Sequence, residues 1–322
     1  MRIALVTPAR PGSRAGNRHT ALRWAAMLRA AGHKVVVSTQ WEPNDKDDLL
    51  LALHARRSHG SIKAFRQAHP GKPIVLELTG TDVYRDIHAD ESARKSLELA
   101  TRFIVLQPKA IEELPKRLRP KAHVVYQSCA SILRHKPVKR KFRLCVIGHL
   151  REEKDPLRAM HAFAPLAGDL ELVQLGDSLD DTLAEQARRG MQSDKRYRWL
   201  GSVSHARALK LLASSHAMII SSRMEGGANV VSEAIRIGVP VIASRISGNV
   251  GLLGVRYPAY YALGDERALA KLIQRARSDR RFYSDVKRQV AKLRTMVSPA
   301  NEARMLIRSV AALTAAGHRA GT

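Results

Sequence analysis

Cysteine, aromatic residues and acidic residues are all scarce in this chain of 322 residues. The two cysteines, Cys129 and Cys145, are too few for a disulfide framework or a structural zinc site. Each lies beside or within an apolar run, so we interpret both as small buried residues. We therefore expect a protein of the reducing cytoplasm.

Long apolar runs are also missing, because no stretch approaches the roughly 20 residues that a membrane-spanning helix needs. The first seven residues, Met-Arg-Ile-Ala-Leu-Val-Thr, predict a strand and not a signal peptide, since they lack a longer apolar region and a cleavage site. The 13 histidines are scattered, without the paired spacing of a zinc-binding helix. We expect no metal and no cofactor other than the substrates.

Positive charge is abundant, with 55 lysines and arginines against 29 acidic residues and a net charge of +26. Such charge favours anionic partners, namely nucleic acid, a membrane surface or small phosphorylated substrates, although a solvated arginine-rich surface also accounts for it. Only 5% of residues are aromatic, and no zinc-finger pattern or RNA-binding motif is present. Specific nucleic-acid binding is therefore not expected.

The length predicts two domains, and short apolar strands alternate with helical segments in both halves. This alternation is typical of parallel sheets with helices on both faces. The expected strands are residues 3–7, 35–38, 49–53, 74–78, 103–106 and 123–126, then 143–147, 170–175, 197–200, 217–221, 239–243 and 257–262.

We expect a first domain over residues 1–138, a second domain over 139–298 and a C-terminal helix within 299–322. The polar segment Arg134–Lys141 reads as a solvated interdomain linker. Ligands of open parallel sheets bind beyond the carboxyl ends of the strands, so two such sheets facing each other would make a cleft. The oligomeric state, monomer or homodimer, stays open.

The most informative segment is Glu225-Gly-Gly-Ala-Asn-Val-Val-Ser-Glu233, which lies between a short buried strand and a helix that stops at Gly238. Free backbone N–H groups and the positive end of the helix dipole converge at such a helix start, and glycines let a diphosphate approach closely. The two carboxylates are better suited to hydroxyls of a ribose and a sugar. The segment therefore predicts a nucleotide-sugar site.

A second loop, Gly148-His-Leu-Arg-Glu-Glu-Lys154, follows the first strand of the second half. Arg151 and Lys154 are one turn apart there, and cations in that position neutralise a diphosphate leaving group. Backbone groups near Ser204 are a weaker candidate for holding a base. The loop 247–251 after another strand is equally consistent with a plain turn.

The first half also places polar and basic residues at its strand ends. Several basic groups converging on one site predict an anionic acceptor. For His54, a structural role and proton transfer both stay open. The candidate acceptor ligands are Arg10, Arg14, Asn17, Arg18, His54, Arg56, Arg57, Thr79, Asp82 and Arg85.

These residues together resemble the retaining GT-B glycosyltransferases of family four, over essentially the whole chain. The resemblance rests on Trp199-Leu-Gly-Ser-Val203, the paired-glutamate segment, Gly238-Val-Pro-Val-Ile-Ala-Ser244 and the loop from Gly148. It implies two Rossmann-like domains facing a cleft, with the C-terminal helix crossing back to the first domain.

The same resemblance implies roles for individual residues. Glu225 and the Gly226–Gly227 amides would contact the donor sugar and diphosphate, Glu233 the ribose, and Lys154 the diphosphate. Catalysis would rest on Glu225, Arg151 and Lys154. The full set of donor ligands is Gly16, Gly148, His149, Arg151, Lys154, Ser204, Glu225, Gly226, Gly227, Ala228, Asn229 and Glu233.

A narrower resemblance is to the selenosugar synthases of selenoneine biosynthesis, which join selenophosphate to the sugar of a UDP-sugar such as UDP-N-acetylglucosamine. It rests on residues 8–18, on 51–58 (Leu-Ala-Leu-His-Ala-Arg-Arg-Ser), on 78–85 (Leu-Thr-Gly-Thr-Asp-Val-Tyr-Arg) and on Val105-Leu-Gln-Pro108. The alternative is a glycosyltransferase acting on a lipid-linked or polysaccharide acceptor at the inner membrane.

Two positions depart from the broader family. His149 replaces a common arginine of the phosphate loop, and Thr79 replaces the histidine that commonly precedes Gly-Thr-Asp. The second change suits selenophosphate, because this soft nucleophile is already anionic and needs positioning and charge compensation more than a general base.

Overall fold

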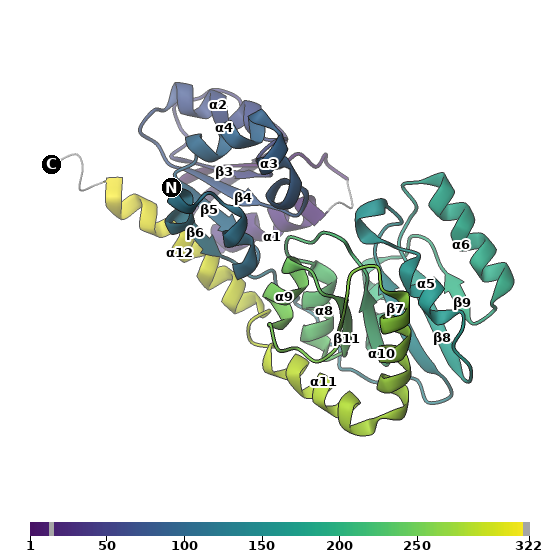
Figure 1. Ribbon diagram of the computed structural model, residues 1–322. Coiled ribbons are helices and arrows are strands. Elements are labelled where there is room, and N and C mark those ends of the chain that lie inside the picture. The colour runs from purple at the N-terminus through teal and green to yellow at the C-terminus, as the bar shows by residue number, and fades with distance from the viewer. Residues whose placement is uncertain (13–15, 318–322) are drawn as a thin grey trace. The chain divides into compact units, whose positions relative to one another are not determined.

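The computed structural model describes residues 1–12 and 16–317, which form two compact units. Unit 1 comprises Met1–Gln127 together with the chain from Pro299 onward, and unit 2 comprises Ser128–Ser298. Figure 1 shows each unit as a sheet covered by helices. The Arg134–Lys141 segment belongs to unit 2. There the backbone N–H groups of His135, Lys136 and Val138 donate to the carbonyl oxygens of Ile237, Ala213 and Ser214.

Unit 1 is built on six parallel strands in the order β2-β1-β3-β4-β5-β6. The apolar residues of the four central strands, β1, β3, β4 and β5, are buried, as in a sheet covered on both faces, whereas Val36 of the edge strand β2 is 48% exposed. The direction of strand order reverses beside β1, so the carboxyl ends of β1, β3 and β4 are where a ligand is expected. The strands are β1 Arg2–Val6, β2 Lys34–Ser38, β3 Leu49–Leu53, β4 Ile74–Leu78, β5 Arg102–Val105 and β6 Ala122–Val124.

Two helices cover each face of this sheet (Figure 1). Helices α2 (His59–Ala68) and α4 (Glu91–Leu99) pack on one face, and α1 (Gly16–Ala30) and α12 (Pro299–Gly317) pack on the other. The buried carboxylate of Glu302 fastens α12 to α1. It accepts a hydrogen bond of 2.8 Å from Trp24 Nε1 and two from the guanidinium of Arg23, at 2.9 and 3.0 Å.

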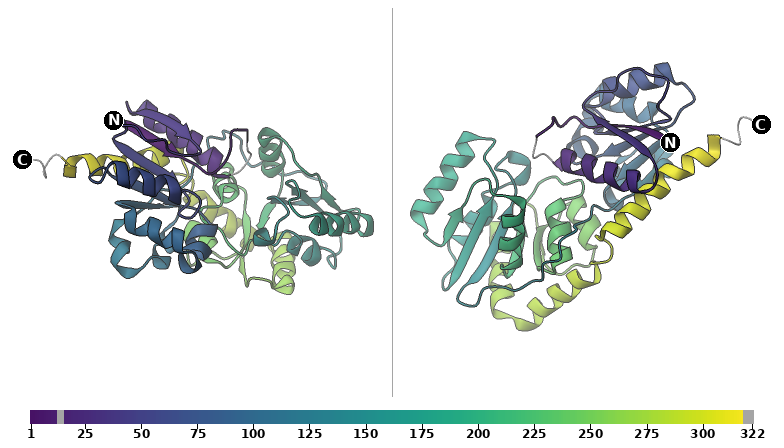
Figure 2. Two further views of the ribbon diagram at one scale, coloured as in Figure 1. Left: turned by 90° about the horizontal axis from the view of Figure 1, so that it is seen from above. Right: turned by 180° about the vertical axis from the view of Figure 1, so that it is seen from behind.

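Unit 2 contains a second sheet of six parallel strands, in the order β12-β11-β10-β7-β8-β9. Figure 2 shows the ribbon of this unit from two further sides. Strand order reverses beside β7, which lies between β8 and β10. The strands are β7 Phe142–Ile147, β8 Leu170–Leu175, β9 Tyr197–Trp199, β10 Ala217–Ile220, β11 Val241–Ser244 and β12 Tyr260–Tyr261. The helices are α5 Arg158–Phe163, α6 Asp181–Ser193, α7 His205–Ala213, α8 Asn229–Ile237, α9 Ser247–Leu253, α10 Glu266–Ser278 and α11 Arg280–Lys292.

The predicted fold class, two parallel α/β units, is confirmed, but two local predictions are wrong. The alternation of strands and helices also predicts a helix at 110–117, but the chain forms a pair of 3₁₀ segments there, Pro108–Glu113 and Lys116–Lys121. Pro115 has no N–H and forces Leu114 into an extended conformation. The loop expected at 247–251 is the helix α9. Among the described residues, no helix is both long and apolar enough to cross a membrane.

Candidate functional site

The loops after β7 and β10 meet in unit 2, because these two strands are neighbours in the sheet. Lys154 Nζ lies 2.5 Å from Glu225 Oε1, and Ser222 Oγ donates to the same oxygen at 2.5 Å. Glu225 is only 6% exposed. Glu225 and Lys154, two of the three residues predicted to be catalytic, are therefore brought into direct contact.

The backbone of the loop after β7 is fastened to the end of β10. Ser221 Oγ donates to the carbonyl oxygens of Lys154 and Asp155, at 3.1 and 2.9 Å, and the N–H of Arg223 donates to Glu153 O at 2.9 Å. Asp155 adopts a left-handed conformation with φ of 43°, which turns the chain toward α5. The position of Lys154 is thus set by backbone contacts as well as by its ion pair.

The start of α8 presents unused backbone donors. Ala228 precedes the helix without a side-chain cap, and its carbonyl accepts from the N–H groups of Val231 and Ser232. Within the described residues, the N–H groups of Gly226, Gly227 and Ala228 have no acceptor. A helix start with free donors beside a lysine can hold an anion. Asn229 begins the helix itself.

Glu233, one turn further along α8, accepts a hydrogen bond at 2.8 Å from Nε2 of His205 at the start of α7. The hydrogen bond with Glu233 raises the pKa of His205 above its ordinary value, although partial burial opposes the shift. His205 was missed by the sequence reasoning, and no spacing signal points to it. The neighbouring Ser204 uses its hydroxyl to cap α7, accepting from Arg207 N at 3.3 Å.

The remaining residues of the predicted phosphate loop lie against the loop after β8. Gly148 N donates to Leu175 O at 2.9 Å, and His149 Nδ1 accepts from Asp177 N at 3.1 Å. A side chain on Gly176 would lie 2.1 Å from the carbonyl oxygen of Gly148, so the two loops need a glycine there. Arg151 buries its Nε without a partner among the described residues.

Unit 1 gathers a second polar cluster at the ends of β3 and β4. His54 is buried with a φ of 75°, and its Nε2 lies 3.2 Å from Thr81 Oγ1. Its Nδ1 faces Asp82 at 3.9 Å, and Asp82 accepts from Thr79 Oγ1 at 2.7 Å and from Ala55 N at 2.9 Å. Burial lowers the pKa of His54, and the charge of Asp82 only partly opposes this. Burial therefore favours the neutral form of the His54 imidazole.

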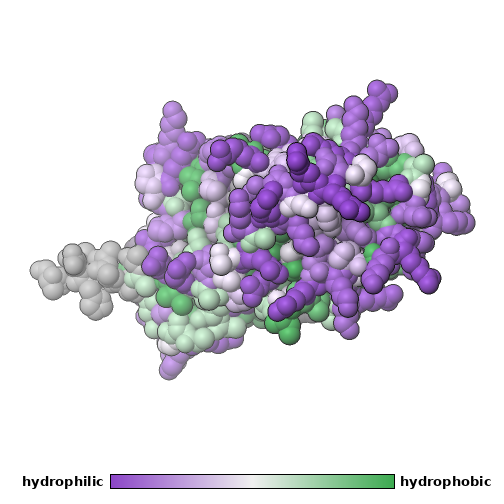
Figure 3. Space-filling view, turned by 90° about the horizontal axis from the view of Figure 1, so that it is seen from below, coloured by the Kyte–Doolittle hydropathy of each residue, from purple (hydrophilic) through white to green (hydrophobic). Residues whose placement is uncertain are grey.

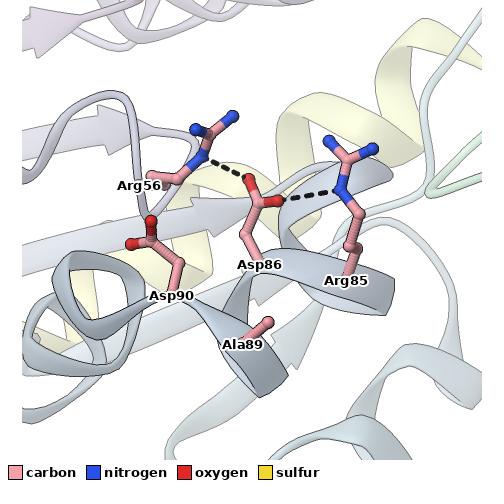
Figure 4. A pocket seen from close by; sticks show the side chains of 5 residues that line it. All are labelled: Arg56, Arg85, Asp86, Ala89 and Asp90. Carbon is pink, nitrogen blue, oxygen red and sulfur yellow. Dashed lines mark hydrogen bonds and ion pairs between the residues drawn. The ribbon is translucent and has the colours of Figure 1, made fainter.

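Beside this cluster, Asp86 accepts a hydrogen bond on each carboxylate oxygen, from Arg56 Nε at 2.9 Å and from Arg85 Nε at 3.1 Å (Figure 4). Burial alone raises the pKa of Asp86, but the bonds from Arg85 and Arg56 outweigh it and hold the pKa below its ordinary value. The three side chains line a hollow of about 310 Å³ together with Ala89 and Asp90.

The other predicted acceptor residues lie elsewhere in unit 1. Arg10 is exposed after β1, Asn17 and Arg18 are in the first turn of α1, and Arg57 is exposed beside Arg56. Within the described residues, no hydrogen bond joins Arg10, Asn17 or Arg18 to the His54 cluster. Gly16, a predicted donor ligand, begins α1. Arg14 lies outside the described residues.

Glu77 is a buried acid that the sequence reasoning missed. It lies on β4 opposite Leu53, is 1% exposed and has no partner for its Oε2 among the described residues. Burial, and secondarily the charge of Asp82, raises the pKa of Glu77 well above its ordinary value. The sequence did contain a signal for a buried acid, because Glu77 is the one charged residue of the otherwise apolar strand Ile-Val-Leu-Glu-Leu.

The architecture, two Rossmann-like units of six parallel strands, is that of the GT-B fold. HepE from Anabaena in complex with UDP and glucose matches with a TM-score of 0.78 at 14% identity, over 97% of this chain and 100% of that one. Sucrose-phosphate synthase from Thermosynechococcus elongatus matches with a TM-score of 0.78 at 16% identity, over 98% and 99%. These likenesses concern the fold.

Sequence comparison gives the family. Residues 132–293, which are 162 of the 322 residues, match the family model of the glycosyl transferases group 1, and the chain belongs to this family. A curated relative, the glycosyltransferase 1 domain-containing protein 1 of Xenopus tropicalis, is 26% identical over 268 residues. The match covers 74% of this chain and 77% of that protein.

Proposed function

We propose that this chain is a selenosugar-forming glycosyltransferase, which transfers the sugar of a UDP-sugar, UDP-N-acetylglucosamine by the resemblance, to selenophosphate. The selenium attacks the anomeric carbon, a C–Se bond forms, the bond to the diphosphate oxygen breaks and UDP leaves. Cleavage of the Se–P bond, which consumes one water, then gives the selenosugar and phosphate. Family membership supports sugar transfer, and the segments at 8–18, 51–58 and 78–85 support this acceptor.

The observation that carries the donor assignment is the Lys154–Glu225 contact beside the free N–H groups of Gly226–Ala228. A diphosphate placed there would accept from these groups and share the ammonium of Lys154 with Glu225. The second oxygen of Glu225 would receive a sugar hydroxyl, and Glu233 would receive the ribose. HepE, which has the same fold, was crystallised with UDP-glucose and with UDP.

Charge compensation at the leaving group is the main chemical task assigned to unit 2. As the anomeric C–O bond breaks, negative charge grows on the diphosphate. Lys154 and Arg151 would stabilise that charge, and preorganised cations act most strongly where the surroundings exclude water. No general base is needed, because selenophosphate is anionic at neutral pH.

The acceptor is assigned to the polar cluster of unit 1. Arg56 is held by Asp86 through its Nε, so the terminal nitrogens of its guanidinium point away from that carboxylate (Figure 4). Guanidinium groups recognise tetrahedral oxyanions through these nitrogens. Neutral His54 fits an acceptor that requires positioning more than proton removal.

Anaerobic mass spectrometry of the purified protein with UDP-N-acetylglucosamine and selenophosphate tests the proposal. We expect UDP together with a sugar that carries the selenium isotope pattern, and no such sugar with thiophosphate or without acceptor. UDP release without a selenium-containing sugar would contradict the selenophosphate assignment and leave the donor site in place.

The second candidate, transfer to a lipid-linked or polysaccharide acceptor at an anionic membrane, is favoured by the net charge of +26. Figure 3 shows one face, on which hydrophilic side chains predominate, so binding of this face to a membrane would be electrostatic. Co-sedimentation with anionic vesicles at low and physiological salt tests this alternative. Salt-sensitive binding supports it, and no binding at low salt argues against it.

A further inference from the structure

Two consecutive serines at the end of β10 hold the two members of the Lys154–Glu225 pair. Ser221 Oγ contacts the backbone of the Lys154 loop, and Ser222 Oγ donates to the carboxylate of Glu225 at 2.5 Å. Successive side chains of an extended chain point to opposite sides, so adjacent residues can serve the two loops separately. Sequence reasoning assigned neither serine a role.

Ser222 is in turn held from β11 and α9. Ser244 Oγ donates to the carbonyl oxygen of Ser222 at 2.7 Å, and Asn249 Nδ2 donates to Ser244 O at 2.9 Å and to Ser244 Oγ at 3.1 Å. All three side chains are buried, with exposures of 2%, 0% and 0%. They form a chain of hydrogen bonds that runs from α9 to Glu225.

The orientation of the Asn249 amide follows from its partners. A backbone carbonyl can only accept, so the atom facing Ser244 O must be the NH₂ group. Asn249 Oδ1 is then buried without a partner among the described residues. Leaving this oxygen unsatisfied costs free energy that an apolar side chain would not. The Asn249 amide is therefore better explained by its hydrogen bonds to Ser244 than by a contribution to the stability of the fold.

Gly248 brings α9 against the backbone of Glu225 itself. A Cβ on Gly248 would lie 2.0 Å from the carbonyl oxygen of Glu225 and 2.8 Å from its Cβ. The backbone of Glu225 is thus packed by Gly248, while Oε1 of its carboxylate is occupied by Lys154 and Ser222. Oε2 makes no hydrogen bond with any described residue.

We propose that Ser222, supported by Asn249 through Ser244, is a positioning residue for Glu225 in sugar transfer. By fixing Oε1, this relay leaves Oε2 as the oxygen that receives a hydroxyl of the donor sugar. The inference rests on the donor site proposed above. It assigns the relay to recognition of the sugar, and not to binding of the UDP moiety.

The test compares Ser222→Ala and Asn249→Leu with the wild type. We expect kcat for UDP-N-acetylglucosamine to fall about 10- to 100-fold, because small displacements of a reacting partner cost that much. The calorimetric affinity for UDP, which has no sugar, should stay within about twofold. Ser222→Thr keeps a hydroxyl and should restore most of the activity, and Ser247→Ala, an exposed neighbour of Asn249, is the matched control.

A double-mutant cycle separates positioning from general disruption. In a Glu225→Gln background, Ser222→Ala should cause little further loss, since residues that act through one another are not additive. Additive losses, or a fall in UDP affinity that matches the fall in kcat, would overturn the inference.

Hydrolysis of UDP-N-acetylglucosamine by the wild type and the variants measures the activity of the donor site without any acceptor. Failure of selenophosphate as acceptor therefore does not affect this test. If the wild type hydrolyses the donor and Ser222→Ala hydrolyses it equally fast, the positioning role of Ser222 is contradicted and the donor site is not. A wild type that neither binds UDP nor consumes the donor overturns the donor site and the relay together.

Discussion

Lys154 Nζ and Glu225 Oε1 lie 2.5 Å apart, although 71 residues separate them in the sequence. The carboxylate is buried and the lysine side chain is 22% exposed, so a ligand from solvent can reach the lysine but not the carboxylate oxygen that it contacts. In the proposed donor site, a diphosphate would therefore share the lysine without displacing the carboxylate.

The first prediction concerns this pair. Lys154→Met should lower UDP affinity and also destabilise unit 2 by about 3 kcal/mol, since it leaves a buried carboxylate without its cation. Chemical denaturation and calorimetry measure the two effects. The double variant Lys154→Met with Glu225→Gln should recover stability without recovering UDP binding, and equal instability of both variants would contradict the ion-pair explanation.

A second prediction follows from the contact between Glu233 and His205. Glu233→Ala should weaken UDP binding roughly tenfold, the cost of losing hydrogen bonds to a charged group, and leave the fold intact. The pKa of His205 should fall, because Glu233 raises it in the wild type. Calorimetry and NMR titration of His205 measure these effects. Glu185→Ala, at an exposed position of α6, is the control, and an unchanged UDP affinity of Glu233→Ala would remove Glu233 from the site.

Gly248 gives a steric prediction. Gly248→Ala places a Cβ within 2.0 Å of the Glu225 carbonyl oxygen, so we expect a destabilisation of about 1–3 kcal/mol and a loss of donor turnover. Gly60→Ala is the matched control, because its Cβ meets no atom within 4 Å and the residue lies in α2. An increase in stability of about 0.5–1 kcal/mol is expected for that control. Full activity of Gly248→Ala would contradict the close packing of α9 on Glu225.

The buried acid of β4 gives a pH prediction. Its folded-state pKa is raised, so between the ordinary value of 4.5 and the folded value the native state binds more protons than the unfolded state. Stability from this group is therefore complete below the ordinary pKa and is lost as pH rises through the folded pKa. Glu77→Gln should flatten this decline when denaturation is measured across neutral and alkaline pH. An unaltered pH profile would show that Glu77 is charged in the native protein.

Acceptor binding is tested at the Asp86 hollow. Arg56→Ala should raise KM for selenophosphate about tenfold or more, since charged hydrogen bonds to an oxyanion are lost, while UDP affinity is unchanged. Steady-state kinetics with UDP calorimetry distinguish the two sites. Lys95→Ala, an exposed cation of α4, is the control. A loss of UDP affinity in Arg56→Ala would argue against a separate acceptor role.

Sequence patterns predicted the features that depend on local composition. Buried parallel strands are continuous apolar runs, and Gly226–Gly227 before an apolar helix is a local signal of a helix start. The relay through Ser222, Ser244 and Asn249 was not predictable, because it depends on the register between β10 and β11 and on a helix that begins at Ser247. In the sequence, the segment 247–251 that contains Asn249 looks like an ordinary turn.

The cluster of unit 1 was predicted only in part. His54, Thr79 and Asp82 follow strand ends, and their proximity follows from the pairing of β3 with β4. Asp86 escaped notice because it lies at the end of a π-helix, Asp82–Asp86, a rare conformation without a sequence signature.

The fastening of α12 to α1 has a consequence for synthesis of the chain. Trp24 and Glu302 are 278 residues apart, and all of unit 2 is translated between them. At about 5–20 residues per second, roughly 14–56 seconds pass before Trp24 meets its partner. During that interval unit 2 can fold on the ribosome, whereas unit 1 still lacks the last helix of one sheet face. Docking of α12 on α1 is therefore a late step in the synthesis of the chain, and the unit that contains the first residues to leave the ribosome is completed only by the last helix.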